Sequence, residues 1–449
     1  MALALALTIL APPLARGAAP PAGPRPENVV IMIPDGCGPA TLVLARLARG
    51  RPLSLDSILV GAVETGSSSS RITDSAAGAT AYASGVKTAN RVVGMDPAGN
   101  PVETLMEAAA SRGMATGFIV KSRVTDATPA AFVAHVRRRS QEDEIAVQEL
   151  AHRVNLIMGG GLDRFLPEPA GGRRADGRDL VAEARGRGDQ VVLDRAEFDG
   201  DLRLPLLALF APAELPYEID RDPKQAPGLV EMVRRGLPLL AREPGGFLLV
   251  IEGSRIDHAA HANDPASHVR EALEFDDTVR EVLAFARRDG RTLVVGAADH
   301  ETGGLSLGRR VGDTPLEGVY PESLMAVRCS AERMADSIRA GHPARELVER
   351  ETGLHLTLEE AGMLDRALRG RRLAETIGEI ESRHAALGWS TWGHTAIDVG
   401  LYAFGPGSDR FRGVLDNTEV GRRIAESLDL QVGGSRSPRA PGRGGPATP

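Results

Sequence analysis

Residues 247–252, Phe-Leu-Leu-Val-Ile-Glu, are five consecutive apolar residues that end on a carboxylate. An apolar run of this length is typical of a strand that is buried on both faces of a parallel sheet. Residues 28–33 and 292–297 have a similar character, and acidic residues follow all three runs. Ligands of open α/β sheets bind at the carboxyl ends of the strands. Because two of these ends also supply histidine, we expect more than one metal ion in one crevice.

Helical segments separate the apolar runs along the chain. Helices are expected at residues 76–83, 102–112, 142–153, 229–241 and 269–288, and further strands at 115–120, 154–158 and 399–404. Strands that alternate with helices predict an α/β fold, in which helices flank a doubly wound, mostly parallel central sheet.

Three stretches interrupt this alternation. Residues 303–392 mix turns with helical segments at 359–369 and 373–386, which predicts a cap-like or crown-like insertion over the crevice. Residues 171–187 are rich in Gly and Arg and are expected to form an exposed excursion. Residues 52–66 are expected to form a mixed connection.

The two ends of the chain differ from the rest. Residues 1–22 are apolar and end in small residues and prolines, as a signal peptide does, although no Lys or Arg precedes the apolar run. This segment predicts a periplasmic or secreted protein, and its length and prolines argue against a membrane span. Residues 433–449 are dominated by Gly, Pro, Ser and Arg and are expected to be disordered. Residues 23–432 are left as the folded domain.

The composition excludes some classes of function. The 449 residues carry a formal net charge of −7, which argues against a nucleic-acid scaffold, and the densest basic cluster, at residues 137–139, is short. Cys37 and Cys329 are too few for a disulfide framework and are expected to be free thiols. A zinc site at Cys37 is disfavoured, because no second Cys or His lies at short spacing.

The strongest pair of candidate ligands follows the first apolar run. Asp257 and His261 are four residues apart, so on a helix they share one face and could bind one ion. Glu252 ends the run itself and could serve a neighbouring ion. His258 either supports a ligand or is an ordinary polar neighbour.

Other candidates are weak when taken singly. Asp299-His300 could bind a metal, but a buried histidine beside an aspartate is equally consistent with the sequence. Asp35 ends an apolar run, where aspartate is also a common turn former. His394 is uninformative by itself.

Ser75 lies at the start of a predicted helix of small residues. Free backbone N–H groups and the helix dipole favour an anion there, and a bound metal would help to ionise the hydroxyl. The alternative is a serine that only caps the helix after the loop at 67–70. Asp126 and Thr128 could form a plain turn or supply the hard oxygen ligands that magnesium prefers.

Six motifs in a fixed order connect these candidates. They are Pro34-Asp35-Gly36, Thr73-Asp74-Ser75-Ala76-Ala77, Asp126-Ala127-Thr128-Pro129-Ala130, Glu252-Gly253-Ser254-Arg255-Ile256-Asp257-His258, Ala298-Asp299-His300 and Gly393-His394-Thr395. With this order, over about residues 28 to 407, the chain resembles the alkaline phosphatase family. The resemblance implies an enzyme that hydrolyses phosphate monoesters to an alcohol and inorganic phosphate.

The resemblance also implies a role for each candidate. Ser75 would be the nucleophile that forms a covalent phosphoserine. Arg139, on the helix after the Asp126 motif, would clamp the phosphate. The implied metal ligands are Asp257, His261 and His394 for one zinc ion; Asp35, Asp299, His300 and the Ser75 hydroxyl for a second zinc ion; and Asp35, Thr128, Glu252 and, through water, Asp126 for one magnesium ion. A homodimer that acts on small-molecule phosphate monoesters is also implied.

Two alternatives stay open. One is a related metal hydrolase or mutase, such as a phosphodiesterase, a sulfatase or a cofactor-independent phosphoglycerate mutase. A sulfatase would need a Cys/Ser-x-Pro-x-Arg context, which residues 75–79 lack. The other is a non-catalytic phosphate- or metal-binding protein, which would lack a ligand or the nucleophile, and none is missing. The chain departs from the family pattern at Cys37, where methionine is common, at His258, where some members have lysine, and over residues 303–392.

Overall fold

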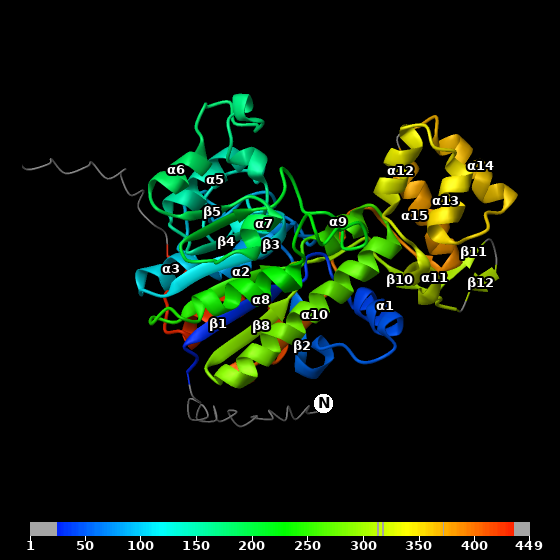
Figure 1. Ribbon diagram of the computed structural model, residues 1–449. Coiled ribbons are helices and arrows are strands. Elements are labelled where there is room, and N and C mark those ends of the chain that lie inside the picture. The colour runs from blue at the N-terminus through cyan, green and yellow to red at the C-terminus, as the bar shows by residue number, and fades with distance from the viewer. Residues whose placement is uncertain (1–24, 312–313, 317, 371, 435–449) are drawn as a thin grey trace, which may run out of the picture.

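The computed structural model describes residues 25–311, 314–316, 318–370 and 372–434, and its centre is a ten-stranded sheet (Figure 1). The strands follow the order β16-β2-β15-β8-β1-β7-β3-β4-β6-β5. Their bounds are β1 (Asn28–Ile33), β2 (Leu59–Glu64), β3 (Ala115–Arg123), β4 (Leu156–Gly160), β5 (Gln190–Val192), β6 (Leu206–Leu209), β7 (Phe247–Glu252), β8 (Thr292–Ala297), β15 (Val399–Phe404) and β16 (Gly413–Asp416). Only β15 runs antiparallel to its neighbours β2 and β8 within this sheet. The predicted mostly parallel α/β fold is confirmed.

The three apolar runs form the middle of the sheet. Strand β1 lies between β7 and β8, and every residue of the three strands is buried. Ile33 pairs with Glu252 and Met32 with Gly296, so the three carboxyl ends lie at one edge. Gly36, just beyond β1, has φ +72°, and a side chain there would lie 2.8 Å from the Asp257 backbone. A glycine is therefore required where the chain turns past this edge.

Helices cover the sheet, and in Figure 1 the long helices α8 and α10 cross its near face. The helices around the sheet are α1 (Pro39–Arg49), α2 (Ser75–Ser84), α3 (Leu105–Ser111), α4 (Ala127–Ala130), α5 (Glu142–Ala151), α6 (Leu180–Gly186), α7 (Arg195–Asp199), α8 (Leu229–Leu240), α9 (Arg255–His261), α10 (Pro265–Asp289) and α16 (Asn417–Ser427). Helix α3 begins three residues later than predicted, because the Thr104 side chain caps it there.

Two connections contain more regular structure than their sequences indicated. Residues 171–187 are not a wholly exposed excursion, because α6 buries Leu180, Val181 and Ala184 in the main core. Residues 52–66 contain the strand β2, which pairs with β15 and β16. Strand β2 is partly exposed along most of its length, so its sequence lacks the continuous apolar run of a central strand.

The described part of residues 303–392 forms a group of helices on the right of Figure 1, with a hydrophobic cluster of its own. The helices are α11 (Pro321–Ala326), α12 (Ala331–Arg339), α13 (Ala344–Thr352), α14 (Leu358–Ala367) and α15 (Leu373–His384). Short strands flank them: β9 (Glu301–Thr302), β10 (Ser306–Leu307), β11 (Arg309–Val311), β12 (Thr314–Leu316), β13 (Leu387–Gly388) and β14 (His394–Thr395). Leu44 of α1 and Val269 of α10 join this cluster and attach it to the sheet domain.

The predicted signal peptide and most of the predicted disordered tail lie outside the described residues. Both cysteines are free, as predicted, and both are buried. In the part of the chain that the structure describes, no helix combines the length and apolar character needed to span a membrane.

Candidate active site

One group of possible metal ligands consists of Asp257 and His261 on α9 and His394 on β14, the strand that follows the helices of residues 303–392. Asp257 and His261 lie one turn apart on α9, with His261 Nε2 3.3 Å from Asp257 Oδ2. Strand β14 pairs with β9 and brings His394 Nε2 to 3.1 Å from His261 Nε2 and 3.9 Å from Asp257 Oδ1. Asp257 and His261, which were predicted to share a helix face, thus lie beside His394, although it is distant in the sequence.

The two histidines of this group, His261 and His394, each place Nδ1 against a backbone carbonyl. His261 Nδ1 lies 2.5 Å from the Trp392 carbonyl, and His394 Nδ1 lies 2.9 Å from the Thr73 carbonyl. Because each Nδ1–H donates to a carbonyl, each ring in its neutral form would direct a lone pair at Nε2 toward the other ring and the carboxylate. A cation between these three groups removes that repulsion, so the residues fit a metal.

A second group, Asp35, Asp299 and His300, lies at the ends of β1 and β8. His300 Nε2 is 3.3 Å from Asp299 Oδ2 and 3.7 Å from Asp35 Oδ1, and all three side chains are buried. Asp35 Oδ1 and Asp299 Oδ2 have no hydrogen-bond partner among the described residues. Buried carboxylate oxygens are rarely left unpaired, so this donor set also fits a metal.

The carboxylates of the crevice repel one another. Burial, followed by the charges of Asp299 and Asp257, raises the pKa of Asp35 well above its usual value. Burial and the nearby Asp126 raise the pKa of Glu252 to about 8. Both shifts arise first from burial and then from neighbouring carboxylates, and divalent cations would favour the charged forms.

The predicted magnesium ligands lie beside this group. Thr128 Oγ1, on α4, is buried and without a hydrogen-bond partner in the described residues, and α4 packs against β7, which ends at Glu252. Glu252 Oε2 accepts from Ser122 Oγ at 3.4 Å. Asp126 instead makes an ion pair with Arg139 at 2.7 Å and lies 3.9 Å from His258 Nε2. The oxygens of Thr128 and Glu252 fit a hard cation.

Ser75 is the first residue of α2, and the cap is Asp74, which accepts from the Ala77 N–H at 3.1 Å. The alternative of a serine that caps the helix is therefore wrong. Ser75 Oγ lies 3.2 Å from His300 Nε2 and 3.4 Å from Arg139 Nη1. The hydroxyl thus sits between the second metal-type group and a guanidinium.

Arg139 is held at Ser75 by backbone and side-chain contacts. The expected helix is wrong here: residues 137–139 form an irregular segment between the Val93–Val136 bridge and α5. The Arg139 N–H donates to the Arg91 carbonyl at 2.8 Å, and its guanidinium lies 3.5 Å from Asp74 Oδ2. Arg139 is therefore directed toward Ser75 by the conformation of a loop and not by its position on a helix.

A pocket of about 680 Å³ opens over these groups. Its lining includes His261 and His394 at the base and four arginines around the rim. The lining residues are Asp74, Asn90, Arg91, Arg137, Arg138, Arg139, Ser140, His261 and His394. An anionic substrate would meet positive charge at the rim before it reaches Ser75.

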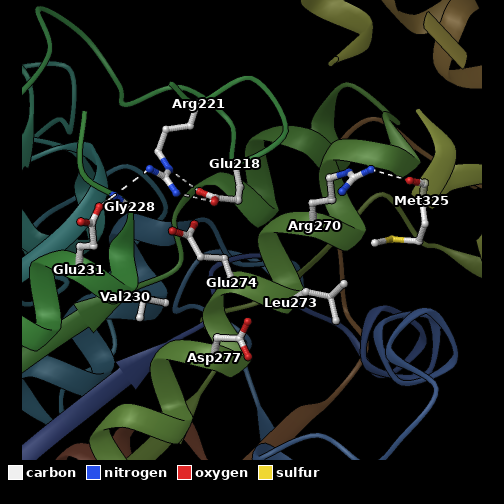
Figure 2. Close-up of a pocket in the computed structure, with 10 residues that line it drawn as sticks. All are labelled: Glu218, Arg221, Gly228, Val230, Glu231, Arg270, Leu273, Glu274, Asp277 and Met325. Carbon is white, nitrogen blue, oxygen red and sulfur yellow. Dashed lines mark hydrogen bonds and ion pairs between the residues drawn. The ribbon is translucent and has the colours of Figure 1, made fainter. Parts of the chain in front are cut away.

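A second pocket, of about 320 Å³, has a different character (Figure 2). It lies between α8 and α10, where Arg221 is paired with Glu218 at 2.7 Å and Glu274 faces the interior. No histidine or cysteine is among its lining residues, which are Glu218, Arg221, Gly228, Val230, Glu231, Arg270, Leu273, Glu274, Asp277 and Met325. This pocket therefore lacks the histidines that line the first pocket, His261 and His394.

Thr302 is a further residue of the site that was not predicted from the sequence. Its hydroxyl donates to Asp257 Oδ1 at 2.5 Å and lies 3.1 Å from His300 Nδ1, so it links the two metal-type groups. The one sequence feature that could have indicated Thr302 is its position two residues after His300.

Comparisons with known proteins agree with this geometry. A family model described as "Alkaline phosphatase" matches residues 26–430. The chain is 39% identical to the repressible alkaline phosphatase of Saccharomyces cerevisiae, over 91% of this chain and 82% of that protein. It is 32% identical to alkaline phosphatase 3 of Bacillus subtilis, over 90% of each. The crystal structure of a cold-active alkaline phosphatase from Shewanella sp. has 32% identity and a TM-score of 0.82, over 89% of this chain and 99% of that one.

Proposed function

The chain belongs to the alkaline phosphatase family and hydrolyses phosphate monoesters, and we propose that it does so through Ser75 as a covalent nucleophile. The observation that carries the proposal is the position of Ser75 Oγ, 3.2 Å from His300 Nε2 and 3.4 Å from Arg139 Nη1. A hydroxyl at a helix N-terminus, between an imidazole and a guanidinium, is placed to attack a bound phosphate.

The protein binds metal, and we propose two zinc ions and one magnesium ion. The zinc ligands would be Asp257, His261 and His394 at one site, and Asp35, Asp299 and His300, with the Ser75 hydroxyl, at the other. Thr128, Glu252 and Asp35 would hold magnesium, with Asp126 acting through water. When bound, the ions would lower the pKa of the serine hydroxyl and of a water molecule, and would neutralise charge on the leaving oxygen.

The residues of the chain orient both halves of the reaction. Ser75 Oγ would form a bond to phosphorus while the bond from phosphorus to the ester oxygen breaks and the alcohol leaves. Water would then attack phosphorus, break its bond to Ser75 Oγ and release inorganic phosphate. Arg139 can hold two phosphate oxygens with its planar fork throughout, and the free N–H groups at the start of α2 favour the same negative charge.

A direct test is to trap the phosphoserine. Purified protein incubated with radiolabelled phosphate at acidic pH, then quenched and digested, should carry label on the peptide that contains Ser75. The Ser75→Ala variant should carry none. Robust phosphomonoesterase activity without any labelled serine would overturn the covalent route.

The remaining alternative within the superfamily is a phosphodiesterase. An arylphosphate monoester and the matching diester, assayed side by side, separate the two activities. The arginine rim favours the monoester, because a monoester dianion carries one more negative charge than a diester. A larger kcat/KM for the diester would favour the alternative.

We also propose that residues 1–22 are removed on export and that the mature protein is a homodimer. Support comes from the apolar leader and from the family. Sequencing of the N-terminus from native cells and light scattering on the purified protein test these two points. An intact Met1 on cytosolic protein, or a monomeric mass, would contradict them.

A further inference from the structure

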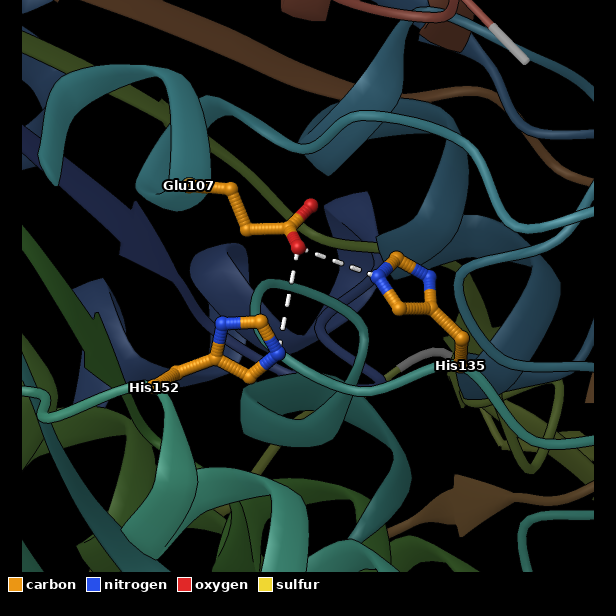
Figure 3. Close-up of side chains that lie close together, drawn as sticks. All are labelled: Glu107, His135 and His152. Atoms are coloured by element: carbon orange, nitrogen blue, oxygen red, sulfur yellow. Dashed lines mark hydrogen bonds and ion pairs between the residues drawn. The ribbon is translucent and has the colours of Figure 1, made fainter. Parts of the chain in front are cut away.

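Glu107, His135 and His152 converge at a point that the proposed reaction does not use (Figure 3). Glu107 is on α3, His135 lies between α4 and α5, and His152 directly follows α5. One ligand atom from each of the three lies within 4.8 Å of those of the other two. The set shares no residue with the two metal-type groups of the crevice.

The distances suit a small divalent ion. Both imidazoles approach the same carboxylate oxygen: Glu107 Oε1 is 3.2 Å from His135 Nε2 and 3.8 Å from His152 Nε2. Ligands at about 2.1 Å from a tetrahedral zinc ion lie about 3.4 Å from one another. The two observed separations lie on either side of that value.

The carboxylate is oriented by its own helix. The other oxygen, Glu107 Oε2, accepts from the N–H and the hydroxyl of Thr104 at 3.0 and 3.2 Å, which forms the capping box of α3. This arrangement fixes Oε1 toward the two histidines. The Glu107 side chain is 3% exposed, so the oxygen that meets the histidines is nearly removed from water.

His135 has the same support as the histidines of the crevice. Its Nδ1 lies 2.6 Å from the Gly94 carbonyl, and its backbone N–H donates to Gln148 Oε1 at 2.8 Å. With the Nδ1–H directed at a carbonyl, the neutral ring presents its Nε2 lone pair to Glu107. Two acceptors at 3.2 Å require either a proton on His135 or a cation between them.

We propose that Glu107, His135 and His152 bind a zinc ion, separate from the catalytic metals. Two histidines and one glutamate are an established donor set for zinc. The His152 side chain is 33% exposed, which leaves a route for the ion from solvent. The rival is an imidazolium–carboxylate ion pair with no metal.

Such an ion would brace the segment that carries the phosphate clamp. It would join α3, the end of α5 and residue 135, four residues before Arg139. The intervening Val136 already pairs with Val93, and the Arg139 N–H donates to the Arg91 carbonyl. The zinc would hold one end of this short segment while those backbone contacts hold the other.

The test is a zinc titration of the full-length protein. Wild type, His152→Gln, Glu107→Gln and the control His355→Gln are stripped with a chelator, returned to a series of buffered zinc concentrations, and analysed for bound zinc. His355 is an exposed histidine outside the site. Glu107→Gln keeps an acceptor for the Thr104 cap, so α3 should remain intact.

Wild type and His355→Gln should bind one more zinc ion per chain than the two site variants. Phosphomonoesterase activity and circular dichroism, measured on the same samples, show that the catalytic metals and the fold are retained. Equal zinc uptake by all four proteins would overturn the proposal and leave the ion pair. Full activity of stripped wild type before any zinc is returned would instead count against the proposed catalytic sites.

Discussion

Arg139 and Asp126 form an ion pair of 2.7 Å inside the crevice, although 13 residues separate them in the chain. Burial alone would raise the pKa of Asp126, but Arg139, together with His258, holds it below its usual range. The same guanidinium reaches to within 3.4 Å of Ser75 Oγ. Asp126 therefore orients the arginine that would meet the phosphate.

Arg139→Ala should weaken phosphate binding selectively. We expect a higher KM, weaker inhibition by inorganic phosphate, and a loss of roughly 1.5–3 kcal/mol in kcat/KM, the scale of a charge-assisted hydrogen bond. Arg137→Ala and Arg138→Ala are matched controls at the rim and should change kcat/KM by about 0.5 kcal/mol or less. Phosphate inhibition constants for the three variants decide the matter. A large effect at Arg138 with none at Arg139 would move the clamp by one residue.

Ser75→Ala should lower kcat by several orders of magnitude, because it removes the attacking oxygen while the other groups stay in place. Zinc binding should be largely retained, since the Asp and His ligands are unchanged. Turnover of an arylphosphate and elemental analysis of the same preparation provide the measurement. Near-wild-type turnover in this variant would show that another group attacks phosphorus.

Chelation should inactivate the enzyme, and zinc together with magnesium should restore it. His394→Ala should weaken the site it shares with Asp257 more than the site at Asp299, because it removes a ligand from only one of the two groups. Metal content of the variants after dialysis tests this difference. Full activity in a preparation free of metal would refute metal catalysis.

Lys121→Met should destabilise the fold without touching the crevice. The Lys121 ammonium is fully buried, 2.9 Å from both carboxylate oxygens of Glu271 and 2.5 Å from Glu274 Oε2. Removing this ammonium takes away the nearest cation of the Glu271 and Glu274 carboxylates, at a loss of about 3–5 kcal/mol. The free energy of urea unfolding gives the value, with the exposed Lys224→Met as the control. Equal losses in both variants would contradict the argument.

His268 should make stability depend on pH. Burial lowers its pKa to about 4, with Nδ1 against the Ile256 carbonyl and Nε2 against the Thr41 hydroxyl. Below pH 6.5 the unfolded chain binds a proton at this residue that the folded chain does not. Stability should therefore fall between pH 6.5 and 4, by on the order of 3 kcal/mol from this group. Urea unfolding of His268→Gln over that range should show a shallower slope, and an unchanged slope would exclude His268 as the cause.

The sequence predicted the parts of the fold that burial dictates. Strands β1, β7 and β8 are buried on both faces, so each required a continuous apolar run that is visible in one sequence. Strand β2 was missed because it is half exposed and carries no such run. The loop at residues 137–139 was taken for a helix, because its shape depends on contacts with Arg91 and Val93, which no local pattern reveals.

The ligands of the crevice could be predicted from local sequence patterns, whereas the group at Glu107, His135 and His152 could not. Asp257 and His261 were recognisable because one helical turn joins them, and the crevice ligands followed from recognised motifs. Glu107, His135 and His152 are 28 and 17 residues apart, with no shared periodicity, and only the packing of α3 against the following segments brings them together.

The crossing from α9 to β14 sets the order in which this protein can acquire metal. Asp257 and His261 precede the helices of residues 303–392, and His394 follows them. A growing or truncated chain that ends before residue 394 holds only two of the three ligands and cannot close that coordination sphere. Tight metal capture at this one site should therefore begin only after the C-terminal part of the chain has been made and has docked, so the occupancy of this site reports on the completeness of each molecule.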